Sequence, residues 1–166
     1  LDTDERRRFA QVSHEYLIEQ VQQQSLTNTA TNDINFNHPV KELIWSGDVA
    51  ISTGLRTALI TTADKTWQLK LNGHDRFAAR NAKYFTRTQI WQHHTGAGGI
   101  DSNATPGAGN CDDSIAVYSF ALKPEEHQPS GTCNFSRIDN AQLVCSTAPG
   151  STGNLFAVNY NVLRIM

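Results

Sequence analysis

The chain has 166 residues, of which 18% are charged, and its formal net charge is −2. A domain of this length buries roughly two-thirds of its unfolded surface, so we expect one domain that needs no disulfide or metal to hold it. The weak net charge argues against nucleic acid as a direct ligand, and no apolar stretch approaches the roughly 20 residues of a membrane span.

The N-terminal third predicts one short helix followed by strands. Residues 3–10 contain a capping residue and good helix formers, so we expect one or two helical turns. From there the periodicity is two: residues 15–24 form a strand candidate with mixed faces, and residues 34–41 alternate apolar and polar side chains. Pro39 lies inside that run and indicates a sheet edge or a bulge. The 16 threonines and 13 asparagines of the chain also favour an all-β fold.

The middle of the chain predicts a hairpin and two further strands. Residues 67–71 alternate cleanly and run into Asn72-Gly73, the commonest tight-turn dipeptide. Residues 84–94 are expected to form another strand, followed by a loop rich in Gly, Ala and Asn. Residues 115–122 are apolar on both faces, as in a central strand that is covered on both sides.

The C-terminal third completes an all-β pattern. Residues 123–131 are a turn region, residues 133–145 are strand-like, and residues 156–162 carry apolar side chains on one face of a last strand. The chain then has seven or eight short strands, one minor helix and no βαβ alternation, so the simplest architecture is an antiparallel sandwich. Composition and periodicity alone fit a lectin, a cupin or a capsid domain equally well.

No residue pattern points to catalysis or to a cofactor. His93 and His94 are adjacent in an expected strand, so their side chains would point to opposite faces, and no metal-binding His-x-His triplet occurs. Asp75 and Arg76 follow a turn and are expected to form an ion pair or a turn-stabilising bond. We therefore expect histidines that pack or hydrogen-bond at a strand end, no metal or other cofactor, and no enzyme activity.

The cysteines and the glycosylation sequons give weaker expectations. Cys111, Cys133 and Cys145 show no CxxC spacing, which favours reduced, partly buried thiols, although a bridge between the last two stays open. Two sequons begin at Asn103 and Asn134. We expect Asn103, in the loop, to be accessible, and Asn134, in a strand-like segment, to be inaccessible and unmodified.

Arg137 and Asp139 suggest a polar clasp. They lie two residues apart in the strand-like segment, and such residues share a face, within reach of each other or of Asn140. If the pair is buried, removal of one partner leaves an unpaired charge at a cost of about 3–5 kcal/mol. We therefore expect Arg137→Ala to damage folding or assembly more than Arg87→Ala.

Six segments, in this order along the chain, resemble one protein family: residues 14–20, 71–77, 92–95, 117–124, 128–140 and 157–165. The run 128–140, named here the signature segment, is the most specific of them. The residues that carry the resemblance best are Asn72, Gly73, Asp75, Arg76, Gln128, Pro129, Ser130, Gly131, Asn134, Phe135, Ser136, Arg137, Asp139 and Asn140. Together the segments resemble the C-terminal jelly roll of the major capsid protein of nucleocytoplasmic large double-stranded DNA viruses.

The resemblance implies a fold and a function. The fold would be an antiparallel eight-stranded jelly-roll sandwich with one short helix near the N-terminus, and residues 1–166 would be the C-terminal domain of a longer double jelly-roll subunit. The chain begins without Met and stops inside an expected strand, which also predicts a piece of a longer polypeptide.

The implied function is structural. Three subunits would form a homotrimer, a pseudo-hexagonal capsomer of an icosahedral shell over an internal membrane. Neighbouring capsomers and minor capsid proteins would be the partners, the membrane would be contacted only indirectly, and assembly would take place in the host cytoplasm.

Two other classes remain open, because jelly rolls recur among lectins and cupin-like enzymes. A lectin site usually gathers aromatic side chains on one face or loop. Trp45, Trp67 and Trp91 instead sit within strand patterns, so we expect them to pack in the core. A cupin-like enzyme would need a metal site.

Overall fold

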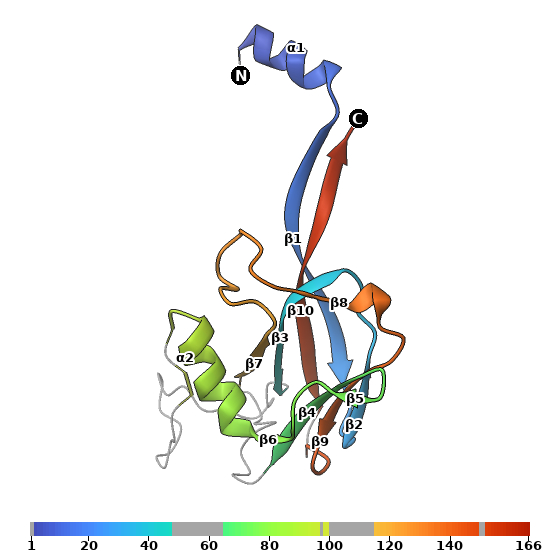
Figure 1. Ribbon diagram of the computed structural model, residues 1–166, viewed down its shortest axis with the longest axis vertical. Coiled ribbons are helices and arrows are strands. Elements are labelled where there is room, and N and C mark those ends of the chain that lie inside the picture. The colour runs from blue at the N-terminus through green and yellow to red at the C-terminus, as the bar shows by residue number, and fades with distance from the viewer. Residues whose placement is uncertain (1, 48–64, 97, 100–114, 150–151) are drawn as a thin grey trace, which may run out of the picture.

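The computed structural model describes residues 2–47, 65–96, 98–99, 115–149 and 152–166. Within these ranges the chain forms two antiparallel sheets that pack as a sandwich, with one helix at the N-terminus and helical turns beside one sheet edge (Figure 1). The all-β jelly-roll class predicted from the sequence is confirmed.

The first sheet has the order β1 (His14–Leu26), β10 (Gly153–Ile165), β3 (Pro39–Gly47) and β7 (Ile115–Ser119), and β8 (Cys133–Asn134) also pairs with β3. The second has the order β2 (Thr31–Ile34), β9 (Ala141–Cys145), β4 (Thr66–Leu71) and β5 (His74–Asp75), and β6 (Arg80–Asn81) also pairs with β4. Apart from the β4–β5 hairpin and the nearby β6, neighbours in each sheet are distant in sequence, which is the crossed connectivity of a Greek-key sandwich.

Helix α1 (Thr3–Gln11) confirms the short N-terminal helix. Asp2 caps it, and a capping box joins Asp2 to Glu5, which satisfies amide groups that the first helical turn leaves unpaired. No residue of α1 is buried.

The core lies where the two sheets face each other. Trp45 on β3 and Trp67 on β4 are each only 1% exposed, and their ring centroids are 5.7 Å apart. Phe85 packs 5.2 Å from the Trp45 ring, so three aromatic side chains join the two sheets. The predicted core position is therefore confirmed for Trp45 and Trp67 but is wrong for Trp91, which is 80% exposed.

Pro39 begins β3, and the predicted bulge follows it directly. Val40 pairs with Asn159 and Glu42 with Val158, so Lys41 is the extra residue on β3. Proline has no backbone N–H to donate, and at the first position of a strand this removes no hydrogen bond from the interior of the ladder.

The strand predicted for residues 84–94 is wrong. The segment instead forms a π-helical turn, η1 (Tyr84–Thr88), that continues into α2 (Gln89–His93). The buried residues Ala82, Phe85, Thr86 and Gln89 recur at helical spacing. Two of these four are polar, so the apolar pattern did not show the helical face, while the β-formers around them favoured a strand.

Two other strand predictions need correction. Residues 115–122 do not form a central strand among the described residues: β7 lies at the end of the strand order there, and η1 and α2 pack beside it (Figure 1). Residues 133–145 are not one strand, because a 3-10 turn, η2 (Phe135–Arg137), separates β8 from β9. In both segments the apolar residues were identified correctly. The elements that pair with these segments or pack against them are distant in sequence, so the local pattern did not reveal them.

Candidate functional site

The tight turn after β4 is joined to the end of the signature segment. Asn72 and Gly73 have φ angles of 52° and 78°, the left-handed backbone that a two-residue hairpin turn requires. The Asn72 side-chain oxygen accepts hydrogen bonds from the backbone N–H groups of Asp139 and Asn140, at 2.9 and 3.2 Å. The Asn72 N–H donates in turn to the Asn140 carbonyl at 2.6 Å. Two segments that resemble family blocks therefore brace one another.

The start of the signature segment is fixed to the end of β7. Gly131 has a φ of +149°, and a Cβ there would lie 2.6 Å from the Phe120 carbonyl oxygen, so only glycine fits. Ser130 Oγ accepts a hydrogen bond from the Lys123 N–H at 3.0 Å, which closes the loop between them. Gln128 and Pro129 are exposed within that loop.

The centre of the signature segment is a capped turn with a buried aromatic side chain. The Asn134 side chain accepts from the Ser136 N–H at 3.1 Å, and Ser136 Oγ accepts from the His38 N–H at 2.8 Å. Phe135 is 3% exposed, and its ring meets those of Phe36 and Phe120 edge to face. The polar side chains thus hold the backbone while Phe135 anchors the turn in the core.

The predicted clasp between Arg137 and Asp139 is wrong. Both residues are exposed, and no ion pair joins them in the described ranges. The reason is that Arg137 ends η2 rather than lying in a strand, so the two residues do not share a strand face. Asn134 is also exposed, against the expectation that it is inaccessible, whereas Asn103 lies outside the described residues.

Asp75 and Arg76 do not pair with each other either. Asp75 lies 4.0 Å from the Lys70 ammonium, and the Arg76 N–H donates to the Leu69 carbonyl at 2.8 Å. Each residue therefore stabilises the hairpin turn through its own contact with β4. Burial raises the pKa of the Cys133 thiol, and the nearby Arg76 charge opposes that rise.

The cysteines in the described ranges are reduced. Cys133 and Cys145 are both free, the first half-buried and the second buried. Cys111 lies outside the described residues.

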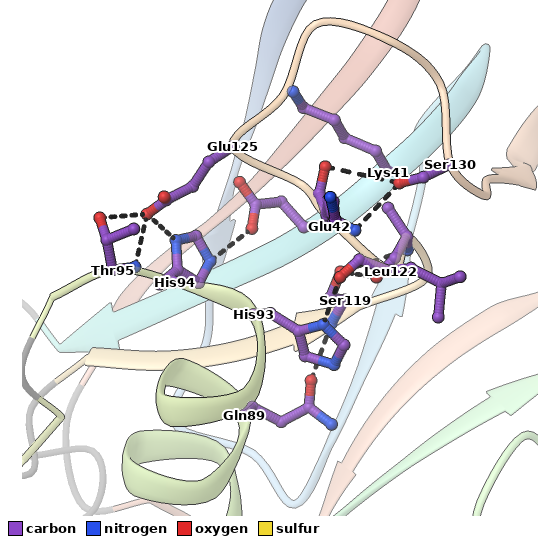
Figure 2. Close-up of polar contacts among 12 residues, drawn as sticks. Lys41, Glu42, Gln89, His93, His94, Thr95, Ser119, Leu122, Glu125 and Ser130 are labelled. Atoms are coloured by element: carbon purple, nitrogen blue, oxygen red, sulfur yellow. Dashed lines mark hydrogen bonds and ion pairs between the residues drawn. The ribbon is translucent and has the colours of Figure 1, made fainter.

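One polar network of the described chain centres on His94, just after α2. Its Nε2 lies 2.9 Å from a carboxylate oxygen of Glu42, and its Nδ1 lies 3.2 Å from one of Glu125 (Figure 2). Glu42 belongs to β3 and is 6% exposed. Only the doubly protonated imidazole ring can donate to both carboxylates at once. The ring therefore joins the sheet, the end of α2 and the loop after β7.

Glu125 receives further hydrogen bonds at the same place. The Thr95 N–H donates at 2.9 Å and the Thr95 hydroxyl at 3.2 Å. The backbone hydrogen bond from Thr95 is the largest cause that lowers the pKa of Glu125, and the Thr95 hydroxyl and His94 add to it. Glu125, in the turn region predicted for residues 123–131, is thus part of an ordered cluster.

Two further bonds fix η1 and α2 against β7 and the residues that follow it. The Ser119 N–H donates to Oε1 of the buried Gln89 at 3.1 Å, and His93 Nδ1 lies 3.2 Å from the Leu122 carbonyl (Figure 2). The sequence prediction that these histidines hydrogen-bond within the protein holds, although they sit at a helix end and not at a strand end.

A second buried charge lies in the β3 bulge. Lys41 is 3% exposed, and its ammonium lies 2.7 Å from a Glu19 carboxylate oxygen and 5.4 Å from the Tyr160 ring centre. His127 Nδ1 lies 3.3 Å from the same Glu19 oxygen. Burial alone would raise the pKa of Glu19, but Lys41 and His127 together outweigh it and lower that pKa.

These charged residues were missed by the sequence analysis. Lys41 and Glu42 stand side by side in a mostly apolar strand, and charges that are buried in such a strand need partners. In the described ranges, no group of three or more His, Cys, Asp or Glu residues is arranged to hold a metal ion. None of the helices in those ranges has the length and apolar character to cross a membrane.

Comparison with known proteins gives one consistent result. The family model for the large eukaryotic DNA virus major capsid protein matches residues 5–166. The major capsid protein of Pyramimonas orientalis virus is 49% identical over the whole chain, and that of Paramecium bursaria Chlorella virus 1 is 39% identical. The chain covers 44% and 50% of these two proteins, so it spans about half the length of the curated relatives it matches.

The solved structures agree. The crystal structure of PBCV-1 VP54, fitted into a reconstruction of the virophage Sputnik, matches the whole chain with a TM-score of 0.75 at 33% identity, and the chain covers 52% of it. The Faustovirus major capsid protein matches at 14% identity with a TM-score of 0.54, which supports the fold alone. With its sandwich, its signature segment and these matches in place, the chain belongs to the large eukaryotic DNA virus major capsid protein family.

Proposed function

We propose that this chain is one jelly-roll half of a structural subunit that builds a virus shell. The observation that carries the proposal is the match of the whole chain to PBCV-1 VP54 at a TM-score of 0.75, together with the family match over residues 5–166. A related solved structure is a quasi-atomic model of the PBCV-1 virus capsid, with a TM-score of 0.74. The longer protein would carry a second jelly roll outside residues 1–166.

The polar networks of this chain suit a load-resisting building block. His94, Glu42 and Glu125 join three separate elements, and the Asn72 contacts brace the hairpin against β9. Each of these side chains makes a hydrogen bond to another residue of the protein. Such a network favours one well-defined shape, which is what repeated packing into a closed shell requires.

The full-length subunit would trimerise into a pseudo-hexagonal capsomer. Neighbouring capsomers and minor capsid proteins would be its further partners, in an icosahedral virion assembled in the host cytoplasm. Obligate interfaces of this kind commonly bury more than about 2,000 Å² and are apolar at their centre. The role needs no catalysis and no cofactor.

Native mass spectrometry and electron microscopy of the full-length protein test the proposal. Discrete trimers at micromolar concentration, and hexagonal particles in micrographs, are the expected result. A full-length protein that stays monomeric at that concentration would contradict it. Glycan-array binding by a monomer would instead favour a lectin, for which Trp91 is the exposed tryptophan while Trp45 and Trp67 are buried in the core.

A further inference from the structure

The loop that joins β7 to β8, residues 120–132, is closed at its neck and held to the rest of the fold near its tip. At the neck, the Lys123 N–H donates to Ser130 Oγ at 3.0 Å. The tip beyond it is exposed. Among the described residues, the hydrogen bonds that join this tip to other elements come from two side chains, Glu125 and His127. The orientation of the tip therefore depends on these two side chains.

His94 lies between Glu125 and the buried Glu42 and contacts both (Figure 2). Its Nδ1 faces Oε1 of Glu125 at 3.2 Å, and its Nε2 faces Oε2 of Glu42 at 2.9 Å. In the part of the chain that the structure describes, no other side chain hydrogen-bonds to the Glu42 carboxylate. A buried carboxylate needs such a partner, so Glu42 holds the ring in place from β3.

The charge of the imidazole ring decides whether both contacts can form. The charged ring has two N–H groups, whereas the neutral ring has one N–H and one lone pair. When the proton is lost, one ring nitrogen turns a lone pair toward a carboxylate oxygen, and that contact becomes repulsive. Glu42 is buried and depends on the ring for a donor, so the remaining N–H stays with Glu42. The contact that is lost is the one to Glu125.

Loss of this proton also weakens the other hydrogen bonds of Glu125, because all of them meet at one oxygen. The Thr95 N–H and hydroxyl donate to the same Oε1 atom, at 2.9 and 3.2 Å. A lone pair of His94 facing that oxygen repels it, so the carboxylate turns away from Thr95 as well. The Glu125 side chain is 40% exposed, and water replaces the lost partners. The end of α2 then no longer holds the loop.

The groups that face His94 are these two carboxylates, one from β3 and one from the loop, and no described cation competes for them. The adjacent His93 ring contacts a backbone carbonyl instead. Lys123 and Glu126 line the same small cavity, but they pair with each other at 3.2 Å. A histidine side chain changes its charge between about pH 5 and 8, so the arrangement switches in that range.

His127 provides the opposite case in the same loop. Its Nδ1 lies 3.3 Å from Oε1 of Glu19, but the Lys41 ammonium lies 2.7 Å from the same atom. A lysine carries its charge throughout the range in which histidines titrate, so Glu19 keeps a partner whether or not His127 is charged. The contact of His127 is therefore not a switch, and this residue is the natural control for His94.

We propose that His94 is a pH-sensitive latch for the loop between β7 and β8. In its charged form the ring holds Glu125 and fixes the tip of the loop to β3 and to the end of α2. As the pH rises through neutrality the ring loses its proton, the contact to Glu125 breaks and the tip is released. Gln128 and Pro129, at the start of the signature segment, lie in this tip, so the pH sets how that exposed stretch is presented.

Hydrogen exchange of the full-length protein from about pH 5.5 to about pH 8.5 tests the latch. Each rate is corrected for the intrinsic pH dependence of amide exchange, measured on the unfolded protein. Protection of peptides that cover residues 122–129 should fall by about threefold to tenfold as the pH rises, the size expected for loss of one hydrogen bond. Peptides from the core of β10 should show no such step. The pKa of Glu125 is lowered from 4.5, so this carboxylate stays charged throughout.

Glu125→Gln is the decisive variant. A glutamine amide can accept from the charged ring and donate to the neutral ring, so the contact survives loss of the proton and the step should disappear. His94→Gln has no charge to lose and should also remove the step. His127→Gln is the matched control and should keep the step of the wild-type protein.

The remaining outcomes decide against the latch. A wild-type protein without the step, or a step of equal size in Glu125→Gln, would overturn it, and so would loss of the step in His127→Gln. If His94→Gln does not fold, Glu125→Gln still decides, because its side chain lies at the surface. The latch belongs to residues of this chain alone, so these outcomes do not depend on whether the full-length protein trimerises.

Discussion

Strand β10 passes through two different environments, and the contrast explains how this molecule is built. In the sandwich, Leu155 and Ala157 are fully buried, with β1 on one side and β3 on the other. A few residues later, Val162 and Leu163 are 57% and 46% exposed. The apolar character of the strand hardly changes between the two regions. What changes is the pairing with β3, which ends at Asn159. Beyond it, among the described residues, β10 pairs only with β1, and these two strands form a ribbon.

The difference separates stability from assembly. Apolar side chains in the sandwich stabilise this domain, whereas those on the ribbon contribute little until something covers them. Mutations in the two regions should therefore differ in the property that they change.

The largest expected effect lies in the core. Trp45→Ala removes the ring that contacts both Trp67 and Phe85 and should lower the free energy of unfolding by about 3–5 kcal/mol. Val162→Ala, on the ribbon, should change it by less than about 0.5 kcal/mol. Urea unfolding of both variants, followed by tryptophan fluorescence and circular dichroism, measures the difference. Similar losses would remove the distinction between the two regions.

The second effect concerns the polar network that holds α2 to the sandwich. His94→Ala leaves the buried Glu42 carboxylate without its imidazole donor, which should cost about 1–3 kcal/mol. His127→Ala is the control, because His127 is mostly exposed and Glu19 keeps its bond to Lys41. Hydrogen exchange should also rise in α2 after the first change and not after the second. Unchanged exchange in α2 would show that His94 does not hold the helix.

The third effect tests the backbone of the signature segment. Gly131→Ala introduces a Cβ only 2.6 Å from the Phe120 carbonyl oxygen at a φ of +149°, and should destabilise the fold by more than about 1 kcal/mol. Gly96→Ala meets nothing within 4 Å and has no positive φ, so it is the matched control. Thermal unfolding of the two variants gives the comparison. A Gly131→Ala protein as stable as wild type would mean that the loop relaxes freely.

How much the sequence predicts depends on the range of the interaction. The strands around residues 15–24, 67–71 and 156–162 were predicted correctly because their period of two is local. The fold class and the hairpin at Asn72-Gly73 followed for the same reason. The strand predicted for residues 84–94 is wrong because the polar residues Thr86 and Gln89 make up half of the buried face of the helix.

Contacts between distant residues escaped prediction. His94 meets Glu42 and Glu125 from positions 52 and 31 residues away, and no spacing rule joins such positions. The exposed end of β10 was also not predicted, because nothing in the sequence of β10 marks the residue at which its pairing with β3 ends. The clasp of Arg137 with Asp139 failed for the opposite reason: it assumed a local strand where the chain makes a turn.

Acid should weaken the network through Glu125. Its pKa is lowered from the usual 4.5 in the folded protein, so its stabilising contribution is present above pH 4.5 and is lost as the pH falls through the lower folded-state value. Glu125→Gln should therefore flatten the acid side of the stability curve. Glu126→Gln changes the net charge equally and is the control. Unfolding midpoints from pH 3 to pH 7 give the test, and equal flattening in both variants would contradict it.

The smallest effect is expected at Arg137, on the surface of the sandwich. Its side chain is exposed and makes no ion pair with Asp139 in the described ranges. The turn that contains it is held by the Asn134 and Ser136 side chains and by buried Phe135. Arg137→Ala should therefore change the free energy of unfolding by no more than about 0.5 kcal/mol.

Arg87→Ala provides the comparison, because Arg87 is half-buried and has partners in the fold. Its loss should cost at least as much as that of Arg137, which reverses the order expected from the sequence. Urea unfolding of the two 166-residue variants measures stability, and trimer yield of the two full-length variants measures assembly. If Arg137→Ala leaves stability intact but lowers trimer yield, its charge acts between subunits. A loss of stability larger than that of Arg87→Ala would instead support the clasp predicted between Arg137 and Asp139.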